Sequence, residues 1–227
     1  MTLGSLGKVA SIATPLLRLR PPRVEDRKDL LEINGDPAVT RFLPYATWES
    51  IDDASAWLEK MAALGVAGTG RHLVLERRSD GKVVGTMLIF RYDPGSGRVE
   101  IGYVLGRRSW GQGLMREAVT ATCEYLFKTM GIRRIEAEVN PANAASWGLL
   151  ERLGFVREGT LRERWIDGES GRPYDTHLYG CLAKEWGALD PTRRRRRVPE
   201  IEKRAASLKK RASVKKKASV KKKMKRR

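Results

Sequence analysis

Residues 99–115 combine residue types and spacing that could hold a phosphorylated ligand. A strand-like run at 99–105 is followed by a loop at 108–113, R-S-W-G-Q-G, and a helix is expected to begin at Leu114. The glycines at positions 111 and 113 let the backbone turn tightly and expose consecutive N–H groups. Together with the positive end of the following helix dipole, these N–H groups would cradle a phosphate or pyrophosphate. The loop therefore predicts a phosphorylated cofactor.

The glycine pattern separates this loop from two other phosphate-binding loops. A P-loop needs G-x-x-x-x-G-K-[ST], and no Lys-Ser or Lys-Thr pair follows these glycines. A dinucleotide fingerprint needs three glycines in G-x-G-x-x-G order and an acidic residue about 20 positions later. The sequence has R-x-x-G-x-G followed by Leu-Met, which resembles the acyl-CoA pyrophosphate loop of the GNAT N-acetyltransferases. An ordinary glycine turn between a strand and a helix can have the same six-residue pattern. The surrounding motifs must therefore distinguish a phosphate-binding loop from such a turn.

Further motifs follow in the expected order. An alternating strand at 134–140 leads into N-x-x-S at 143–146, and L-G-F stands at 153–155. With F-L-P at 42–44 and D-T-x-x-Y at 175–179, these motifs resemble the GNAT branch that acetylates the N-terminal alanine or serine of ribosomal proteins. The resemblance covers about residues 16 to 187 and implies an acetyl-CoA-dependent N-acetyltransferase.

Acetyl transfer from a thioester to an amine needs a neutral amine, a stabilised oxyanion and a proton for the leaving thiolate. Glu100 is the candidate base, directly or through a water, because its E-I-G-Y setting resembles the corresponding strand of relatives. A carboxylate that is partly desolvated in a cleft has a raised pKa, which helps it accept a proton near neutral pH. The alternative is a strand carboxylate that faces water or pairs with an arginine.

Ser146 is the candidate proton donor or hydrogen-bond donor to the leaving sulfur, a role implied mainly by the resemblance. Many GNAT members have a tyrosine four residues beyond this position, where this sequence has Leu150. The departure moves the role to Ser146 or to a tyrosine elsewhere, such as Tyr179. A serine early in a helix is otherwise a capping or solvent-facing residue.

The resemblance also implies the residues that bind acetyl-CoA. The backbone of Val104 and Leu105 would pair with the pantetheine amides, and Asn143 would bind the pantetheine arm or a phosphate oxygen, or cap its helix. Trp110 would cover the cofactor or serve as a packing anchor. The residues expected at the phosphates are Arg108, Trp110, Gly111, Gln112, Gly113 and Leu114. No metal is expected, since the two cysteines form no C-x-x-C pair and the chain has only two histidines.

An aromatic loop, F-L-P-Y at 42–45 together with Trp48, would wall the acceptor slot or simply pack into the core. The two histidines, His72 and His177, fall in strand-like runs and are interpreted as structural. The near-neutral charge of the domain favours a peptide acceptor slightly over a strongly cationic one.

The net charge of +18 is concentrated at the C-terminus. Residues 191–227 carry 19 Lys or Arg against two Glu, which leaves 26 basic and 25 acidic residues in 1–190. The tail contains a hexapeptide repeat, ASLKKR, ASVKKK and ASVKKK, with too few apolar residues for a core, so it is expected to be disordered. We therefore expect an N-terminal extension at 1–15, an acetyltransferase domain at 16–190 and a Lys/Arg-rich tail at 191–227. The tail is suited to nucleic acid or the ribosome, and a membrane is the least expected partner because an amphipathic pattern is missing.

Periodicity and element order predict a mixed α/β sheet. The resemblance implies that this fold is of GNAT type, with a mostly antiparallel central sheet flanked by helices. The expected elements are strands at 16–20, 72–76, 83–92, 99–105, 133–139, 155–165 and 175–182, and helices at 24–34, 51–64, from 114, and 143–152. No run of 18 apolar residues and no clear signal peptide is present, so a cytoplasmic protein is expected.

The leading hypothesis is acetylation of a protein N-terminal α-amine, such as that of a ribosomal protein. A second hypothesis keeps the reaction but makes the acceptor a small amine, a polyamine or an aminoglycoside. A third is a nucleic-acid-binding protein whose acetyltransferase-like domain only senses acyl-CoA. Intact residues at the expected catalytic and cofactor positions argue against the third.

Overall fold

The computed structural model describes residue 6 and residues 11–186, and the expectations for the basic tail lie outside these residues. The strands are β1 (Ile12–Ala13), β2 (Leu17–Arg20), β3 (Gly70–Arg77), β4 (Val83–Asp93), β5 (Arg98–Leu105), β6 (Arg134–Val139), β7 (Val156–Ile166) and β8 (Pro173–Leu182). The helices are α1 (Arg27–Asn34), α2 (Pro37–Thr40), α3 (Ile51–Val66), α4 (Leu114–Glu124), α5 (Ala144–Arg152) and α6 (Ala183–Trp186). Short 3-10 turns span Val24–Asp26 and Arg107–Ser109, and a π-helical turn, Tyr125–Thr129, continues α4.

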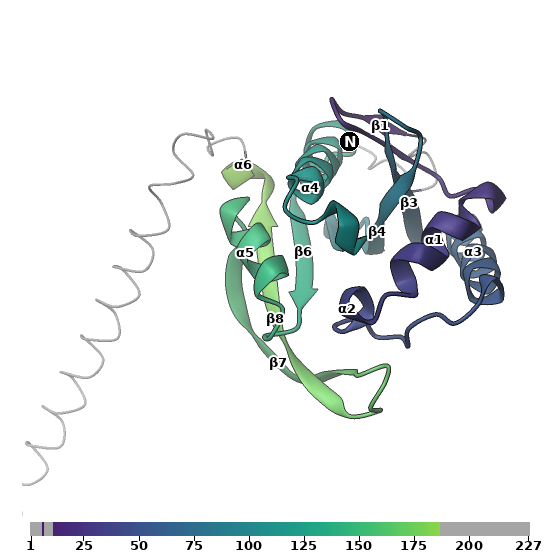
Figure 1. The fold of residues 1–227 in the computed structure, drawn as a ribbon. Helices are drawn as coiled ribbons and strands as arrows, with labels where there is room; N and C mark the ends of the chain where they lie inside the picture. The colour runs from purple at the N-terminus through teal and green to yellow at the C-terminus, as the bar shows by residue number, and fades with distance from the viewer. Residues whose placement is uncertain (1–5, 7–10, 187–227) are drawn as a thin grey trace, which may run out of the picture. The chain divides into compact units, whose positions relative to one another are not determined.

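The strands form one mixed sheet in the order β1-β2-β3-β4-β5-β6-β8-β7 (Figure 1). Each neighbouring pair is antiparallel except β5 and β6, which run parallel because α4 crosses between them. This confirms the predicted mixed, mostly antiparallel sheet flanked by helices.

Apolar side chains on the two faces of the sheet make two separate cores. On one face, strand residues such as Leu73, Met87 and Ile101 pack with α4 residues such as Ala118 and Val119. On the other face, side chains of α1 and α3 pack on strand residues, a cluster made of Leu30, Ile33, Ala54, Val74 and Val83. Successive residues of a strand point to opposite faces, so each strand residue is assigned to the α4 face or to the α1–α3 face.

The pairing between β5 and β6 stops early. Only residues 98–100 of β5 pair with residues 134–136 of β6. Beyond Glu100 and Glu136, β5 continues beside β4, and β6 continues beside β8. The two parallel strands therefore separate in the middle of the sheet, and their facing backbone edges are left without a strand partner among the described residues.

Two short elements differ from the sequence-based expectations. β1 extends the sheet to residues 12 and 13, ahead of the domain start expected at 16, by pairing with β2. Helix α2 lies in a segment expected to be loop, although Asp36 caps it and Pro37 opens it, which is a recognisable start signal. Within the described residues, no helix is long and apolar enough to cross a membrane.

Candidate active site

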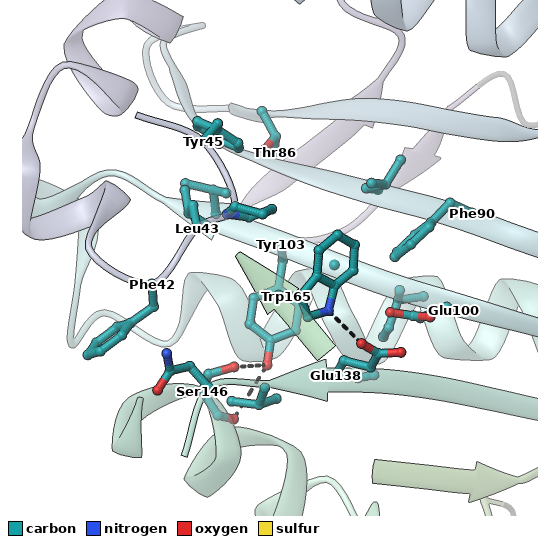
Figure 2. A pocket seen from close by; sticks show the side chains of 18 of the residues that line it. Phe42, Leu43, Tyr45, Thr86, Phe90, Glu100, Tyr103, Glu138, Ser146 and Trp165 are labelled. Carbon is teal, nitrogen blue, oxygen red and sulfur yellow. Dashed lines mark hydrogen bonds between the residues drawn. The ribbon is translucent and has the colours of Figure 1, made fainter. Parts of the chain in front are cut away.

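A cavity of about 400 Å³ opens where β5 and β6 separate. Its walls come from the loop after α2, from α3, from the middle strands, from the start of α5 and from the β7–β8 hairpin (Figure 2). The residues that line it include Phe42, Leu43, Pro44, Tyr45, Trp57, Lys60, His72, Leu88, Phe90, Glu100, Gly102, Tyr103, Val104, Glu138, Asn143, Ser146, Trp165, Tyr174 and Thr176. Glu100, Val104, Asn143, Ser146 and the aromatic loop at 42–45 were all singled out from the sequence, and the structure brings them together here.

Glu100 is buried in the cavity wall and belongs to a network of charges. Its Oε2 accepts a hydrogen bond of 2.6 Å from Nη1 of Arg91, and the same Nη1 donates to Oε1 of Glu138 at 2.7 Å. Burial, together with repulsion from Glu138, raises the pKa of Glu100 to about 7, although Arg91 opposes the rise. A carboxyl group with this pKa can both accept and release a proton near neutral pH.

Glu138 plays a different part in the same network. Its carboxylate also accepts hydrogen bonds from the guanidinium of Arg164 at 3.1 Å and from Nε1 of Trp165 at 2.5 Å. Burial alone would raise the pKa of Glu138, but the bonds from Arg164, Trp165 and Arg91 outweigh it, and the pKa lies below its ordinary value. Glu138 is therefore a fixed anion, and Glu100 is the carboxyl group of this pair that titrates.

A bulge in β4 places Arg91 between the two carboxylates. The β4–β5 register shifts between Phe90 and Asp93, and Arg91 has a φ of +50°. This left-handed conformation is unfavourable for a residue with a side chain, so the contacts of Arg91 must hold it there. Besides the two ion pairs, the guanidinium lies 5.4 Å from the ring centre of Phe90 and 5.3 Å from that of Trp165.

Tyr103 and Ser146 form a hydroxyl pair in the same cavity. Their oxygens are 3.0 Å apart, and the Tyr103 hydroxyl is also 3.4 Å from the carbonyl of Ser146 (Figure 2). Burial raises the pKa of Tyr103, so its hydroxyl stays protonated at neutral pH. Ser146 lies in the first turn of α5, where its N–H donates to Oδ1 of Asn143 at 3.2 Å. Asn143 thus caps α5, as one of its two interpretations predicts.

Glu100 and Tyr103 lie on opposite faces of β5. The side chain of Tyr103 packs against the α4-face core, whereas Val104 packs against the α1–α3 core, and Glu100 shares the face of Val104. Both residues nevertheless line one cavity, because the missing β6 partner leaves an opening through the sheet. An acid on one face and a hydroxyl pair on the other can therefore act on the same reacting centre.

The predicted phosphate loop has the expected backbone. Gly111 and Gly113 have φ values of +73° and +77°, and Gly113 is the residue that precedes α4. At both positions a Cβ would meet no atom within 4 Å, so the backbone angle rather than space requires glycine. Leu114, the first residue of α4, is buried, which fixes the helix start against the core.

Three side chains around this loop have structural contacts. Nε1 of Trp110 donates to the Leu105 carbonyl at 2.7 Å, so Trp110 anchors the loop to the end of β5. Gln112 donates to the Arg108 carbonyl at 2.9 Å. The Arg108 side chain is 88% exposed and reaches Glu32 at 3.3 Å. None of these loop residues lines the cavity, so they would act on the distant, phosphate-bearing part of the cofactor.

Tyr179 lies elsewhere in the described structure. It is buried, and its hydroxyl donates to Oε1 of Glu151 at 3.1 Å. It is absent from the residues that line the cavity, whereas Tyr103 lies in the wall beside Ser146.

His177 is held between Arg157 and Thr160 on the β7–β8 pair, in agreement with a structural role. His72, by contrast, lines the cavity.

Sequence reasoning did not single out Arg91, Tyr103, Glu138 or Trp165. Tyr103 had a signal: it lies three residues after Glu100 on one strand, so it must face the other side of the sheet. Glu138 had a weaker signal, because it is the third charged residue in the alternating run R-I-E-A-E at 134–138. Arg91 had no signal in the sequence, because the bulge that places it is a register shift, and a register shift depends on the partner strand.

The comparison with protein families agrees with this geometry. Residues 17–156 match the model of the acetyltransferase (GNAT) domain. An uncharacterized N-acetyltransferase, p20, of Bacillus licheniformis is 32% identical over 176 residues, which is 78% of this chain and 98% of p20. The chain belongs to the GNAT acetyltransferase family. It is an acetyl-CoA-dependent N-acetyltransferase.

Two further relatives of this GNAT enzyme carry more specific names. The [ribosomal protein uS5]-alanine N-acetyltransferase of Escherichia coli is 44% identical over 70 residues, which is 30% of this chain and 36% of that protein. The structure of Mycobacterium smegmatis RimJ in complex with CoA-disulfide has a TM-score of 0.71 at 22% identity, covering 83% of this chain and 94% of RimJ. The second likeness shows a common fold.

The described residues fit acetyl-CoA as a substrate. The glycine loop offers backbone N–H groups at the start of α4. The edge of β5 that faces the gap is free of a strand partner and can pair with the amides of a pantetheine arm. The Leu105 carbonyl on that strand already accepts the Trp110 indole, which leaves its second lone pair for a ligand.

Proposed function

We propose that this enzyme acetylates the N-terminal α-amine of a protein, such as a ribosomal protein, by direct attack in a ternary complex. The observation that carries the proposal is the cavity that passes through the sheet, with Glu100 on one face and the Tyr103–Ser146 pair on the other. Acetyl-CoA would enter on the face of α4 and α5, and the acceptor amine on the face of α1 and α3.

Each side chain then has a defined part in the reaction. Glu100, directly or through a water, removes a proton from the acceptor ammonium, and the neutral nitrogen attacks the thioester carbonyl. The C–N bond forms, and the tetrahedral intermediate then loses its C–S bond. The Ser146 hydroxyl, which Tyr103 holds by a hydrogen bond of 3.0 Å, gives its proton to the leaving sulfur and takes up the second proton of the former amine nitrogen, so that a neutral amide and a thiol are released.

The charges of the cavity favour an acceptor with a single amine. Both buried acids, Glu100 and Glu138, already contact Arg91, and Glu138 also binds Arg164. A polyamine or an aminoglycoside would bring further ammonium groups and would need further acids, which these two pairs do not offer. Lys60 at the wall adds a positive charge. The uS5-alanine enzyme, which shares 44% identity over 70 residues, supports a peptide acceptor.

A contact that covers the acceptor side of the cavity also fits a peptide that enters by its end. The tip of the β7–β8 hairpin touches the aromatic loop, and a Cβ at Gly168 would overlap the backbone of Tyr45. This contact covers one side of a slot lined by Phe42, Leu43 and Tyr45. An N-terminus is a part of a protein that can enter such a slot end-on.

The experiment is incubation with acetyl-CoA and separate N-terminal peptides, polyamines and aminoglycosides, with detection of released thiol. Mass spectrometry of the peptide products distinguishes the α-amine from lysine ε-amines. The proposal expects turnover on the α-amine of peptides. Turnover only on polyamines or aminoglycosides would favour the small-amine alternative, and acetyl-CoA binding without turnover on any acceptor would favour an acyl-CoA sensor.

A further inference from the structure

His72 is a polar residue of the acceptor cavity that the proposed transfer leaves without a role. It alternates along β3 with Leu73 and Leu75 of the α4-face core, so its ring points to the α1–α3 face, as Glu100 does. Its Nδ1 atom is buried and has no hydrogen-bond partner among the described residues. Because buried polar atoms are nearly always paired, an acceptor atom in the cavity is a natural partner.

The imidazole of His72 is neutral. The ring of Trp57 meets it edge-on at a centroid distance of 4.8 Å. Burial, and then the charge of Lys60, lower the pKa of His72 to about 3. A neutral imidazole still offers one N–H donor.

Lys60 places a positive charge at the same end of the cavity. It follows Trp57 by three residues on α3, so the two share a helix face, and both line the cavity. Within the described part of the chain, the salt bridges formed by the cavity acids Glu100 and Glu138 go to arginines, and Lys60 takes part in none. The α3 end therefore combines an N–H donor with an unpaired ammonium.

We propose that Lys60 and His72 form an acceptor subsite for a carboxylate, namely an acidic side chain within the first three residues of the acceptor peptide. Charge-assisted hydrogen bonds from an ammonium and an imidazole N–H match the two oxygens of a carboxylate. The subsite rests on the proposed function, because it assumes that the acceptor amine lies at Glu100.

The strand register gives the spacing between subsite and base. His72 pairs with Leu88, and Leu88 pairs with Gly102, so His72 lies two strands from β5. Glu100 is two residues along β5 from Gly102, which puts the two Cα atoms roughly 12 Å apart at ordinary strand spacings. Leu88 lies between them on β4 and forms part of the cavity wall, and Gly102 adds no side chain on β5. An extended peptide covers such a distance in about three residues.

The test uses the full-length enzyme and peptides of equal length that share their first residue. One series carries Glu at position 2, 3, 4 or 5, and a matched series carries Gln. We expect Glu at position 2 or 3 to lower the acceptor KM about fivefold relative to Gln, the scale of a partly exposed charge pair. At position 5 the ratio should be close to one.

Three variants assign the effect to Lys60. Lys60→Met should abolish the preference for Glu, and Lys28→Met, on the exposed side of α1, should retain it. Lys60→Glu should reverse it, so that a peptide with Lys at the same position has a lower KM than the Gln peptide. Such a reversal would not follow from a structural defect.

Equal KM values for Glu and Gln peptides in the unmodified enzyme, or an intact preference in Lys60→Met, overturn the subsite while leaving N-terminal acetylation in place. If peptides are not acetylated at all, the proposed function fails separately. The subsite is then tested with ω-amino acids of increasing length against amines of equal length that lack the carboxylate. The same fivefold preference supports the subsite, and its absence overturns it.

Discussion

Removal of Arg91 should shift the pH dependence of catalysis upward. Nη1 of Arg91 lies 2.6 Å from Glu100 and 2.7 Å from Glu138, and it opposes the rise in the pKa of Glu100 that burial causes. In Arg91→Ala, Glu100 keeps its burial and its repulsion from Glu138 but loses the adjacent cation. The carboxylate form of Glu100, which is the base, then becomes less stable.

The size of the shift follows from Coulomb's law. Two unit charges 4 Å apart interact by about 1 kcal/mol in water and about 4 kcal/mol at an effective dielectric constant of 20. The Arg91 side chain is 37% exposed, so the lower part of this range applies. One pKa unit corresponds to about 1.4 kcal/mol, so the pKa of Glu100 should rise by about one unit from its value near 7. At pH 7 the ionised fraction would fall about fivefold, and it would recover by pH 9.

The assay is kcat/KM for a peptide acceptor between pH 5.5 and 9.5. Arg91→Ala should move the acidic limb up by about one pH unit, and Arg91→Lys should move it less because it keeps a charge. The matched control is Arg164→Ala, which removes a cation whose salt bridge within the described residues goes to Glu138 and not to Glu100. A profile for Arg91→Ala that overlies the unmodified one would refute the assignment of Glu100 as the titrating base.

A glycine variant separates this electrostatic role from a structural one. Because Arg91 has a φ of +50°, alanine at this position retains backbone strain that glycine relieves. The free energy of unfolding of Arg91→Gly should therefore exceed that of Arg91→Ala by about 1 kcal/mol. Both should show the same shift of the pH profile. If the pH profile followed stability instead, Arg91 would act through the fold.

Five other changes test the rest of the site and the tail. Glu100→Gln should keep acetyl-CoA affinity and lower kcat by about 100-fold or more, the scale for loss of a general base; a change confined to acceptor KM would make Glu100 a binding residue. Tyr103→Phe should lower kcat about tenfold or more, because the hydroxyl beside the serine is lost, whereas Tyr179→Phe should stay near the unmodified rate; the opposite order would return the role to Tyr179. Gly111→Asp should weaken acetyl-CoA binding in calorimetric titration by roughly 1–4 kcal/mol through repulsion of the pyrophosphate, and unchanged affinity in a folded variant would mean an ordinary turn. A chain that ends at Asp190 should keep its turnover on a short peptide and lose salt-sensitive binding to RNA and DNA; equal binding of both chains at low salt would contradict a tethering tail.

Much of the fold was predictable because it depends on local patterns. Alternation of apolar and polar residues predicted the strands, and helical spacing of apolar residues predicted α3 and α4. The order strand, helix, strand predicted the parallel β5–β6 pair. The turn residues S-D-G at 79–81 stand between the expected strands at 72–76 and 83–92, which form the antiparallel β3–β4 hairpin. The two-residue strand β1 was missed because its pattern is too short to stand out, and it depends on pairing with β2.

The site was predictable only in part, for a physical reason. Glu100, Asn143 and Ser146 belong to local motifs, so sequence spacing could identify them. Arg91 and Glu138 meet across 47 residues of chain, and their contact depends on a β4 bulge and on the register of β6. That Tyr103 lines the cavity and Tyr179 does not likewise depends on which strand face borders the opening.

The point where β5 and β6 separate accounts for the location of the proposed chemistry. Residues three apart on a strand, such as Glu100 and Tyr103, face opposite sides of a sheet, and in a continuous sheet the backbone of the next strand would separate them. Pairing stops just after Glu100, so the opening begins at the residue proposed as base and includes the residue proposed to hold the acid. Acceptor and thioester can then approach from opposite faces without competing for space. A change that extends the β5–β6 pairing beyond Glu136 should therefore close the site even if every catalytic side chain is kept.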